Sequence, residues 1–368
     1  MKFKSNIKSF IGGSALVAAF ISNPIQAAQV TFTEIPGDIT ISGNVLATIS
    51  VSDEGTVVFS HNFDLYKWNS SEGLVNLGDF PEIPYSWNTS YSEKPHIGAN
   101  ISADGQVIAF DYYSSDDIMY PLPNVGTFIN YIYSEGNLQI LEGLNGGLSK
   151  NISPDGTTLG GRTTTYNLTD GTQSGNYVNG LPWFGWLSKY DWGRNVHFSN
   201  DSNIFTMANQ LVTIDETGTT AQEVPGMTDT VLGMGRITDL SGDGNIVVGT
   251  FKTDPSCDNV TCYANQRWDS TTDTSTIITM LLESTNYDGS IIVGASGNSG
   301  SVWDEVNGIR DITDMLSENG IDISNWTNTR LKEISTDGTY IVGYGKNPEG
   351  QLRGFLISSI PECTTGLF

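Results

Sequence analysis

The sequence has few cysteines, few histidines and few basic residues, and no long apolar run follows residue 21. Three cysteines in 368 residues are too few for a fold that depends on disulfides. The 17 lysines and arginines are outnumbered by 41 aspartates and glutamates, which gives a formal net charge of −24. This acidity argues against nucleic acid and anionic lipid as partners, because phosphate groups attract basic surfaces. Without an apolar run of about 20 residues, no membrane insertion of the mature chain is expected.

The first 27 residues have the pattern of a secretory signal peptide. Lys2, Lys4 and Lys8 are followed by an apolar stretch at 10–21 and then by small residues up to Ala27. The apolar stretch is too short to span a bilayer, which needs about 20 residues. We therefore expect residues 1–27 to be removed and the protein to be exported to the periplasm or the extracellular space.

A short motif, Ser-x-Asp-Gly followed by apolar residues, recurs along the rest of the chain. Clear copies begin at Ser102, Ser153, Ser241 and Ser335, and three degenerate copies fill the gaps between them. The glycine of the motif, or the serine that replaces it, falls at positions 55, 105, 156, 202, 244, 289 and 338. The mean spacing of about 47 residues matches the period of one blade in β-propellers. The register of these copies predicts a repeat fold.

Each part of the motif has a physical reason. Asp-Gly tolerates the positive φ of a tight hairpin turn, and the serine hydroxyl can bond the turn backbone. The apolar residues after the turn do not alternate with polar ones, which is typical of a strand covered on both faces. In three copies a glycine follows this strand (Gly249, Gly294 and Gly343), which indicates a place where a side chain does not fit.

Four short strands can be recognised in each unit, and they predict an all-β fold: a seven-bladed β-propeller of four-stranded blades. The last unit lacks an outer strand. We expect the N-terminal segment Val30–Ile35 to pair beside Phe355–Ile357 and so to close the ring. The propeller domain is then residues 28–360, with a C-terminal tail at 361–368. The alternative, a β-solenoid or open repeat array, would not need the donated strand.

These repeats resemble those of the bacterial secreted proteins called HAF-type and, more distantly, the Ser-Pro-Asp-Gly propellers of the TolB kind. The resemblance covers nearly the whole mature chain. The nearest match to the His-Ala-Phe signature is Arg353-Gly354-Phe355. The resemblance implies export and a binding scaffold, and it implies no particular reaction.

The long connections are expected to gather on one face. If the strands of a unit are named A to D, the Asp-Gly turns join A to B on one face, and the segments 79–96, 111–127, 162–181, 250–264 and 316–330 fall between B and C or between D and A. Such a face is often the binding face of a repeat protein. Its aromatic rings and acids suit sugar or peptide recognition, although long loops also pack their own aromatics. The candidate binding residues are Tyr85, Trp87, Tyr91, Tyr112, Tyr113, Asp116, Asp117 and Tyr263.

Cysteine, metal and catalytic chemistry are only weakly indicated. Cys257 and Cys262 are close enough to form a local disulfide in an exported protein, and no role is predicted for Cys363. No metal site or cofactor is predicted; calcium is left open at Asp116–Asp117 and at Asp254–Asp258. No catalytic residue is assigned, because no histidine lies in a known catalytic motif. His96 is the one acid–base candidate.

Three functions therefore remain open. The first is a binding scaffold that contacts a glycan, a peptide or a cell-surface component through the long loops. The second is a polysaccharide-active enzyme, a lyase or glycoside hydrolase, that uses carboxylates and His96 on the same face. The third is a structural or adhesive surface module.

Overall fold

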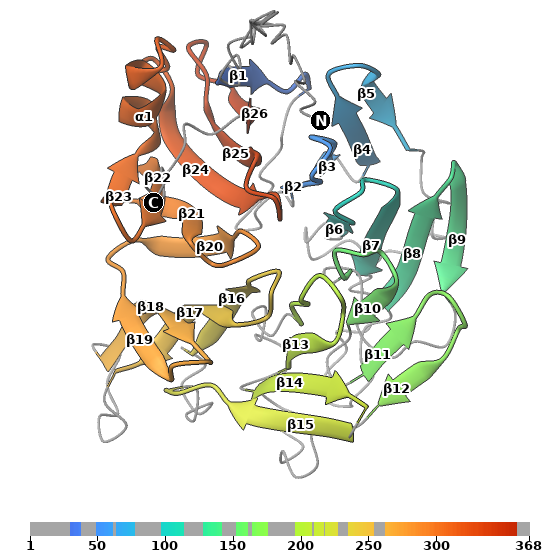
Figure 1. Cartoon of the computed structure of the whole chain (residues 1–368). Helices are drawn as coiled ribbons and strands as arrows, with labels where there is room; N and C mark the ends of the chain where they lie inside the picture. The colour runs from blue at the N-terminus through green and yellow to red at the C-terminus, as the bar shows by residue number, and fades with distance from the viewer. Residues whose placement is uncertain are drawn as a thin grey trace, which may run out of the picture.

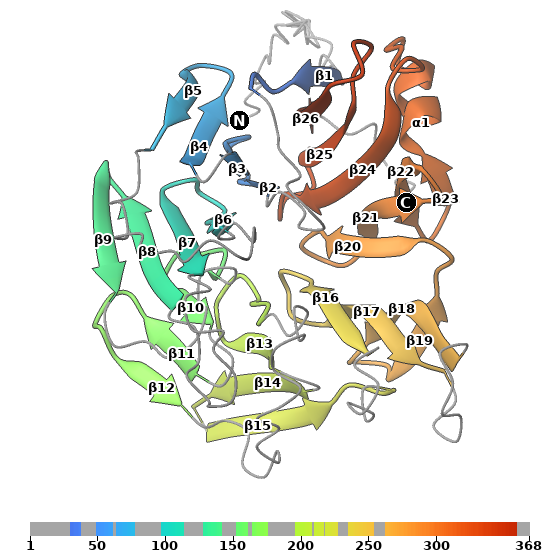
Figure 2. The same ribbon diagram turned by 180° about the vertical axis from the view of Figure 1, so that it is seen from behind.

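A computed structural model shows antiparallel sheets arranged like blades around one axis (Figures 1 and 2). The protein is a β-propeller. The structure describes residues 30–37, 49–61, 64–77, 97–113, 128–141, 152–160, 164–175, 196–207, 210–216, 218–226, 235–253 and 262–358. The expected signal peptide and the C-terminal tail at 361–368 lie outside these residues.

Five of the sheets have four strands each. They are β2 (Ile49–Val51), β3 (Val57–His61), β4 (Asp64–Asn69) and β5 (Gly73–Asn76); β6 (Ile97–Ile101), β7 (Val107–Tyr113), β8 (Phe128–Ser134) and β9 (Asn137–Leu141); β16 (Arg236–Leu240), β17 (Ile246–Lys252), β18 (Tyr263–Asp269) and β19 (Thr274–Ile277); β20 (Leu281–Thr285), β21 (Ile291–Ser296), β22 (Ser299–Asp304) and β23 (Gly308–Asp311); and β24 (Thr327–Ile334), β25 (Tyr340–Lys346), β26 (Leu352–Ser358) and β1 (Thr31–Glu34). A short helix, α1 (Ile312–Glu318), follows β23.

Two further sheets have three strands each. They are β10 (Thr158–Gly160), β11 (Thr164–Asn167) and β12 (Gln173–Gly175), and β13 (Ile204–Met207), β14 (Gln210–Asp215) and β15 (Gly218–Glu223). The prediction of seven four-stranded blades is therefore wrong. In the described part of both units the inner strand is reduced to one bridge, Ile152↔Leu159 or Phe198↔Phe205. The strand that each bridge meets, β10 or β13, has three or four residues, and the residues at 142–151 and 191–195 lie outside the described part of the chain.

The predicted closure by the N-terminal strand is confirmed. β1 pairs with β26 from Thr31↔Ser358 to Glu34↔Phe355, and Figure 1 shows the two strands side by side. The next residue, Ile35, donates its backbone N–H to Gly354 O at 2.9 Å. Its side chain is fully buried in the core cluster between the last blade and the first. The N-terminal segment thus completes a sheet and fills the joint between two blades.

The motif serine organises each Asp-Gly turn from the inside. Ser241 is fully buried; its Oγ accepts from Ile246 N at 2.9 Å and donates to Asp243 Oδ1 at 2.6 Å. The same pair of bonds recurs at Ser102, Ser153, Ser199 and Ser335. The motif glycines have φ between +68° and +77°. The repeated aspartate therefore has a structural role within its own turn.

Neighbouring turns are joined to one another by hydrogen bonds, most of them between backbone groups. Asp53 N donates to Ala103 O at 2.7 Å, and Ala103 N donates to Pro154 O at 2.8 Å. Proline has no N–H to continue this series, and Ser202 Oγ bonds Asp155 Oδ1 at 2.9 Å instead. The remaining links are Asn200 N to Gly242 O, Asp243 N to Tyr287 O, Tyr287 N to Thr336 O, and Asp337 N to Asp53 Oδ1.

The two ends of the blades differ in the length of their connections. At one end, which we call the turn face, each motif turn separates two strands by five residues, as between Val51 and Val57. At the other end, the loop face, connections run over residues 77–96, 114–127, 176–195 and 312–326. Some boundaries differ from expectation: 162–181 contains β11 and β12, and the segments that begin at 111 and 250 begin within strands.

Candidate functional site at the inner strands

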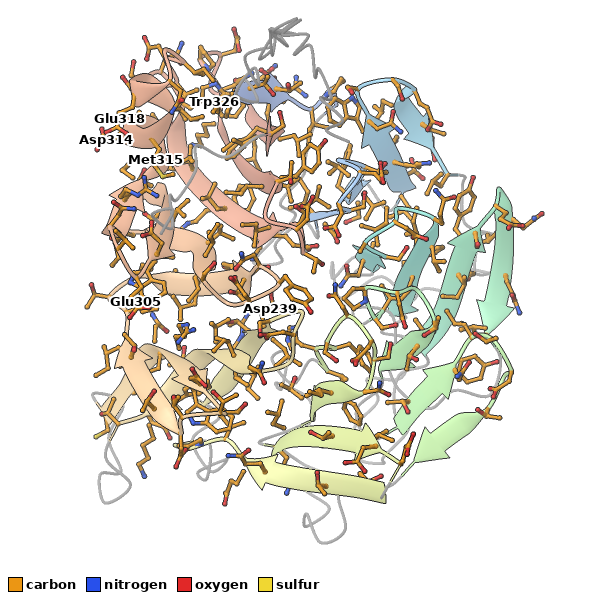
Figure 3. The ribbon with its side chains drawn as sticks, viewed as in Figure 1. Asp239, Glu305, Asp314, Met315, Glu318 and Trp326 are labelled. Carbon is orange, nitrogen blue, oxygen red and sulfur yellow. The ribbon has the colours of Figure 1, made fainter. Side chains whose placement is uncertain are left out.

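The innermost strands of neighbouring blades lie side by side around the axis: β16 beside β20, β20 beside β24, β24 beside β2, and β2 beside β6. On each of them, the residue two positions before the motif serine, or the asparagine that replaces it, is polar. We call this set the inner ring, and within the described chain it consists of Ser50, Asn100, His197, Asp239, Ser284 and Glu333. Figure 3 shows Asp239 directed toward the middle of the propeller.

One half of the inner ring is held by Ser50. Its Oγ lies 2.7 Å from Asn100 Oδ1 and 2.8 Å from Glu333 Oε1. Asn100 Oδ1 also accepts from the Ile101 backbone N–H at 2.8 Å, which fixes the amide with its oxygen toward Ser50. A hydroxyl has one proton, so Ser50 cannot donate to both neighbours at once. A proton on Glu333 resolves the conflict, because Glu333 then donates to Ser50 and Ser50 donates to Asn100.

Burial of the Glu333 carboxyl raises its pKa to about 8, although the residue as a whole keeps some exposed surface. Hydrogen bonds from Ser50 and from the Val51 backbone oppose this rise; the charge of Asp239 adds to it and that of Lys332 reduces it. At neutral pH the side chain is therefore mostly protonated, in agreement with the hydrogen-bond geometry.

The other half of the inner ring is held by Asp239. Oδ1 accepts from its neighbour Leu240 N at 2.8 Å and lies 3.2 Å from His197 Nδ1. Oδ2 accepts from Ser284 Oγ at 2.7 Å and from Thr285 N at 2.9 Å. The carboxylate thus joins three consecutive units and orients the imidazole. His197 Nε2 is buried, and among the described residues it has no hydrogen-bond partner.

Three of the inner strands carry a β-bulge beside the inner ring. The register shifts between Ile237 and Asp239, between Leu282 and Ser284, and between Leu331 and Glu333. Opposite each bulge stands a glycine, and a Cβ there would meet a backbone carbonyl of the inner strand: Gly249 against Arg236 O at 2.1 Å, Gly294 against Leu281 O at 1.8 Å, and Gly343 against Arg330 O at 2.3 Å. The prediction that no side chain fits at these glycines is confirmed.

The bulged residues add charge at this site. Glu283 and Lys332 are the bulged residues of β20 and β24, and Lys332 Nζ lies 2.6 Å from Glu283 Oε2. Both side chains are largely buried, with exposed fractions of 15% and 20%. Bulges often redirect side chains near functional sites. Three consecutive blades therefore concentrate ionisable groups on one side of the axis.

The residues that the sequence singled out are only partly described. Tyr112 and Tyr113 belong to β7, where Tyr112 pairs with Ile97 and Ile129. Tyr263 is the first residue of β18; its hydroxyl is buried and, within the described chain, has no hydrogen-bond partner. The predicted residues Tyr85, Trp87, Tyr91, His96, Asp116, Asp117 and Cys257 lie outside the described residues.

Cys262 is disulfide-bonded and almost fully buried. Its partner is not among the described residues, since Cys257 and Cys363 both lie outside them. The pairing of Cys262 with Cys257 stays a prediction.

Trp326 lies in the connection before β24, which was expected to contribute to the binding face. Its ring packs edge-on against Phe32 and Phe355, with centroids 5.2 and 5.6 Å away (Figure 3). This tryptophan belongs to the core cluster beneath β1.

Across the described ranges, no three His, Cys, Asp or Glu side chains are grouped so that they could hold a metal ion. No helix in the same part of the chain is long and apolar enough to cross a membrane.

Comparison with known proteins finds no matching family model and no matching curated protein. Similar solved structures include a chain of a mitotic checkpoint complex, with 12% identity, 96% of this chain and 99% of that chain covered, and a TM-score of 0.49. A streptogramin B lyase shows 14% identity, coverage of 90% and 99%, and a TM-score of 0.48. A putative TolB from Agrobacterium tumefaciens shows 11% identity, coverage of 85% and 89%, and a TM-score of 0.35. The assignment to β-propellers rests on the sheets of this chain itself.

The inner ring was missed at the level of the sequence, although a signal for it exists. When the copies of the motif are aligned on their serine, the position two residues earlier is Ser, Asn, Asn, His, Asp, Ser and Glu. An unbroken polar column on strands that otherwise carry buried apolar residues indicates a shared environment. The residue just before the serine is apolar in each of the six copies that have the serine.

Proposed function

We propose that this protein is an exported binding scaffold that takes its ligand, a glycan, peptide or surface component, on the loop face. The observation that supports this most strongly is the difference between the two faces. On the turn face, short turns are tied together by backbone bonds from blade to blade. The long connections all begin and end at the loop face, where insertions can vary without disturbing the ring.

Two connections are the first candidates for ligand contact. Residues 77–96 precede β6 and residues 114–127 follow β7, so both start from the loop-face end of the same hairpin. They contain Tyr85, Trp87, Tyr91, Asp116 and Asp117. Aromatic rings next to acids suit the apolar faces and hydroxyls of sugars.

A glycan array with the purified full-length mature protein, with and without calcium, tests this proposal. Trp87→Ala should weaken binding by about 2 kcal/mol or more if this ring is an anchor, and it should leave the melting temperature nearly unchanged. Trp326→Ala is the matched control, because that ring is packed in the core and its loss should lower stability. If Trp87→Ala unfolds the protein while binding per folded molecule is unchanged, the contact assignment is wrong.

A second candidate, acid–base catalysis on a polysaccharide, is supported by one observation. Glu333, which holds a proton at neutral pH, and His197, which Asp239 orients, belong to the same inner ring. Such a reaction needs a proton donor together with a second ionisable side chain. Chain cleavage that is lost in both His197→Gln and Glu333→Gln, in folded protein, would support this function; binding without cleavage of any ligand found would exclude it.

A further inference from the structure

Three neighbouring inner strands, β16, β20 and β24, carry an Arg-Leu-Arg pattern at one equivalent position. Arg236, Leu281 and Arg330 are the residues whose carbonyls stand against the bulge glycines, so they are structurally equivalent. Each precedes a buried residue, Ile237, Leu282 or Leu331, and alternation along the strand places it on the opposite side. Arg236 is exposed, Leu281 is 51% exposed and Arg330 is partly exposed. We call these three residues the arginine arc.

The guanidinium groups of Arg236 and Arg330 have no anionic partner among the described residues. In the same part of the chain, the side chains of Arg236, Arg330 and Lys346 make no hydrogen bond and no ion pair. Other cations on the strands do: Lys332 with Glu283, Arg310 with Asp304, Arg353 with Glu34, and Lys67 with Glu72.

Two cations stand at strand ends on the loop face. β16 begins at the loop face with Arg236, and β25 ends there with Lys346. The motif turns of the opposite face carry aspartates or glutamates in every copy and no lysine or arginine. Two acids on the neighbouring inner strands are neutralised, Glu283 by Lys332 and Glu333 by its proton. Asp239, on the same strand as Arg236, is bonded to His197, to Ser284 and to two backbone N–H groups. The field near the arc is therefore more favourable to an anion than the net charge of the protein suggests.

We propose that the arginine arc binds an acidic oligosaccharide, with a carboxylate or sulfate group on each guanidinium and the apolar face of a sugar ring on Leu281. Arginine binds carboxylate and sulfate in a two-pronged geometry that lysine does not offer. Arg236 and Arg330 belong to two different blades, and the blade of Leu281 stands between them. The ligand must therefore carry at least two anionic groups. This inference rests on the proposed binding function and names its ligand class.

The test is a titration of the full mature chain with three probes of similar length: an oligogalacturonate, a sulfated dextran oligosaccharide and neutral dextran. The wild type should bind at least one acidic probe more tightly than neutral dextran, and the ratio of the two acidic affinities identifies the anionic group. Arg236→Gln and Arg330→Gln should each weaken acidic binding by about tenfold and reduce its salt dependence. Neutral binding should be unchanged.

Lys67→Gln, which removes one positive charge from a strand end near the turn face, is the matched control and should have no effect. Equal weakening by Lys67→Gln would show a non-specific charge effect and overturn the inference. Binding of neutral but not acidic probes would overturn it and leave the proposed binding function standing. If no glycan, peptide or surface component binds in any screen, the proposed function fails as well. Leu281→Ala should weaken the binding of the acidic oligosaccharides and leave the binding of inorganic sulfate unchanged.

Discussion

The hydroxyl of Ser50 lies 2.8 Å from Glu333 Oε1, and this contact joins the inner strand of the last blade to that of the first. It lies at the joint where the ring closes, between β24 and β2. The same carboxyl oxygen also accepts from the Val51 backbone N–H at 3.3 Å. A neutral Glu333 fits this arrangement, whereas a charged one would lie buried close to Asp239. The contact between the inner strands of the last and first blades therefore fits a protonated Glu333.

We expect the stability of the protein to fall as the pH rises, and Glu333→Gln to remove part of this fall. The folded-state pKa of about 8 lies above the ordinary value of 4.5. The stabilising contribution is fully present below pH 4.5, decreases between pH 4.5 and 8, and is lost above pH 8. Each pKa unit corresponds to about 1.4 kcal/mol, so the total change is on the order of 5 kcal/mol.

Urea unfolding at pH 5 and pH 9 measures this effect. Glu333→Gln should be more stable than the wild type at pH 9 and should show a smaller difference between the two pH values. The exposed Glu305→Gln is the control and should follow the wild type. If Glu333→Gln has the same change of unfolding free energy between pH 5 and pH 9 as the wild type, Glu333 is charged in the folded state and the prediction is wrong.

The N-terminal strand should contribute strongly to stability through one side chain. Ile35 is fully buried between the first and last blades, and Ile35→Ala should cost about 3 kcal/mol of unfolding free energy because it leaves a cavity there. Thr31→Ala, at an exposed position of the same strand, should change stability by less than about 0.5 kcal/mol. Calorimetry of both variants measures the difference. Similar melting temperatures for the two would mean that β1 is dispensable.

The turns and the closure could be predicted from the sequence because their causes are local and repeated. Asp-Gly after a serine requires a tight turn wherever it occurs, and the missing outer strand of the last unit left Val30–Ile35 as the segment available to complete it. The glycines after the apolar triplets also pointed to a close approach, which the structure identifies as the carbonyls beside the bulges.

The inner strands of two units could not be predicted in the same way. Ile152 and Phe198 precede the motif serine just as Ile101 and Leu240 do, yet each forms a single bridge. The length of an inner strand depends on what packs around the axis, which no local pattern reports. The inner ring is hidden for the same reason: Glu333 and Ser50 are 283 residues apart in the sequence and meet only when the ring closes.

Cys262 should have no titratable thiol in the native, non-reduced protein, since it is disulfide-bonded. Peptide mapping without reduction should identify Cys257 as its partner. A loop this short gives a stabilisation of only about 2–3 kcal/mol, and Cys262→Ser should lower the unfolding free energy by that amount or less. A mapped bond between Cys262 and Cys363 would contradict the predicted pairing.

Gly294→Ala should destabilise the protein and move the inner strand β20. A Cβ at this position would lie 1.8 Å from the Leu281 carbonyl oxygen, and that oxygen belongs to the backbone, so relief requires the strand to shift. The expected cost is about 3 kcal/mol, at the upper end of the range for overpacked positions. Gly308→Ala is the control: its φ is +69°, and no atom lies within 4 Å of the added Cβ, so it should cost only about 1 kcal/mol of backbone strain.

Because Leu281 belongs to the arginine arc, Gly294→Ala should also weaken acidic oligosaccharide binding at temperatures where the protein is fully folded, and Gly308→Ala should not. If the two variants are equally stable, β20 moves at its bulge without a large cost in free energy. The contact between Gly294 and the Leu281 carbonyl would then not fix the position of Leu281 in the arginine arc.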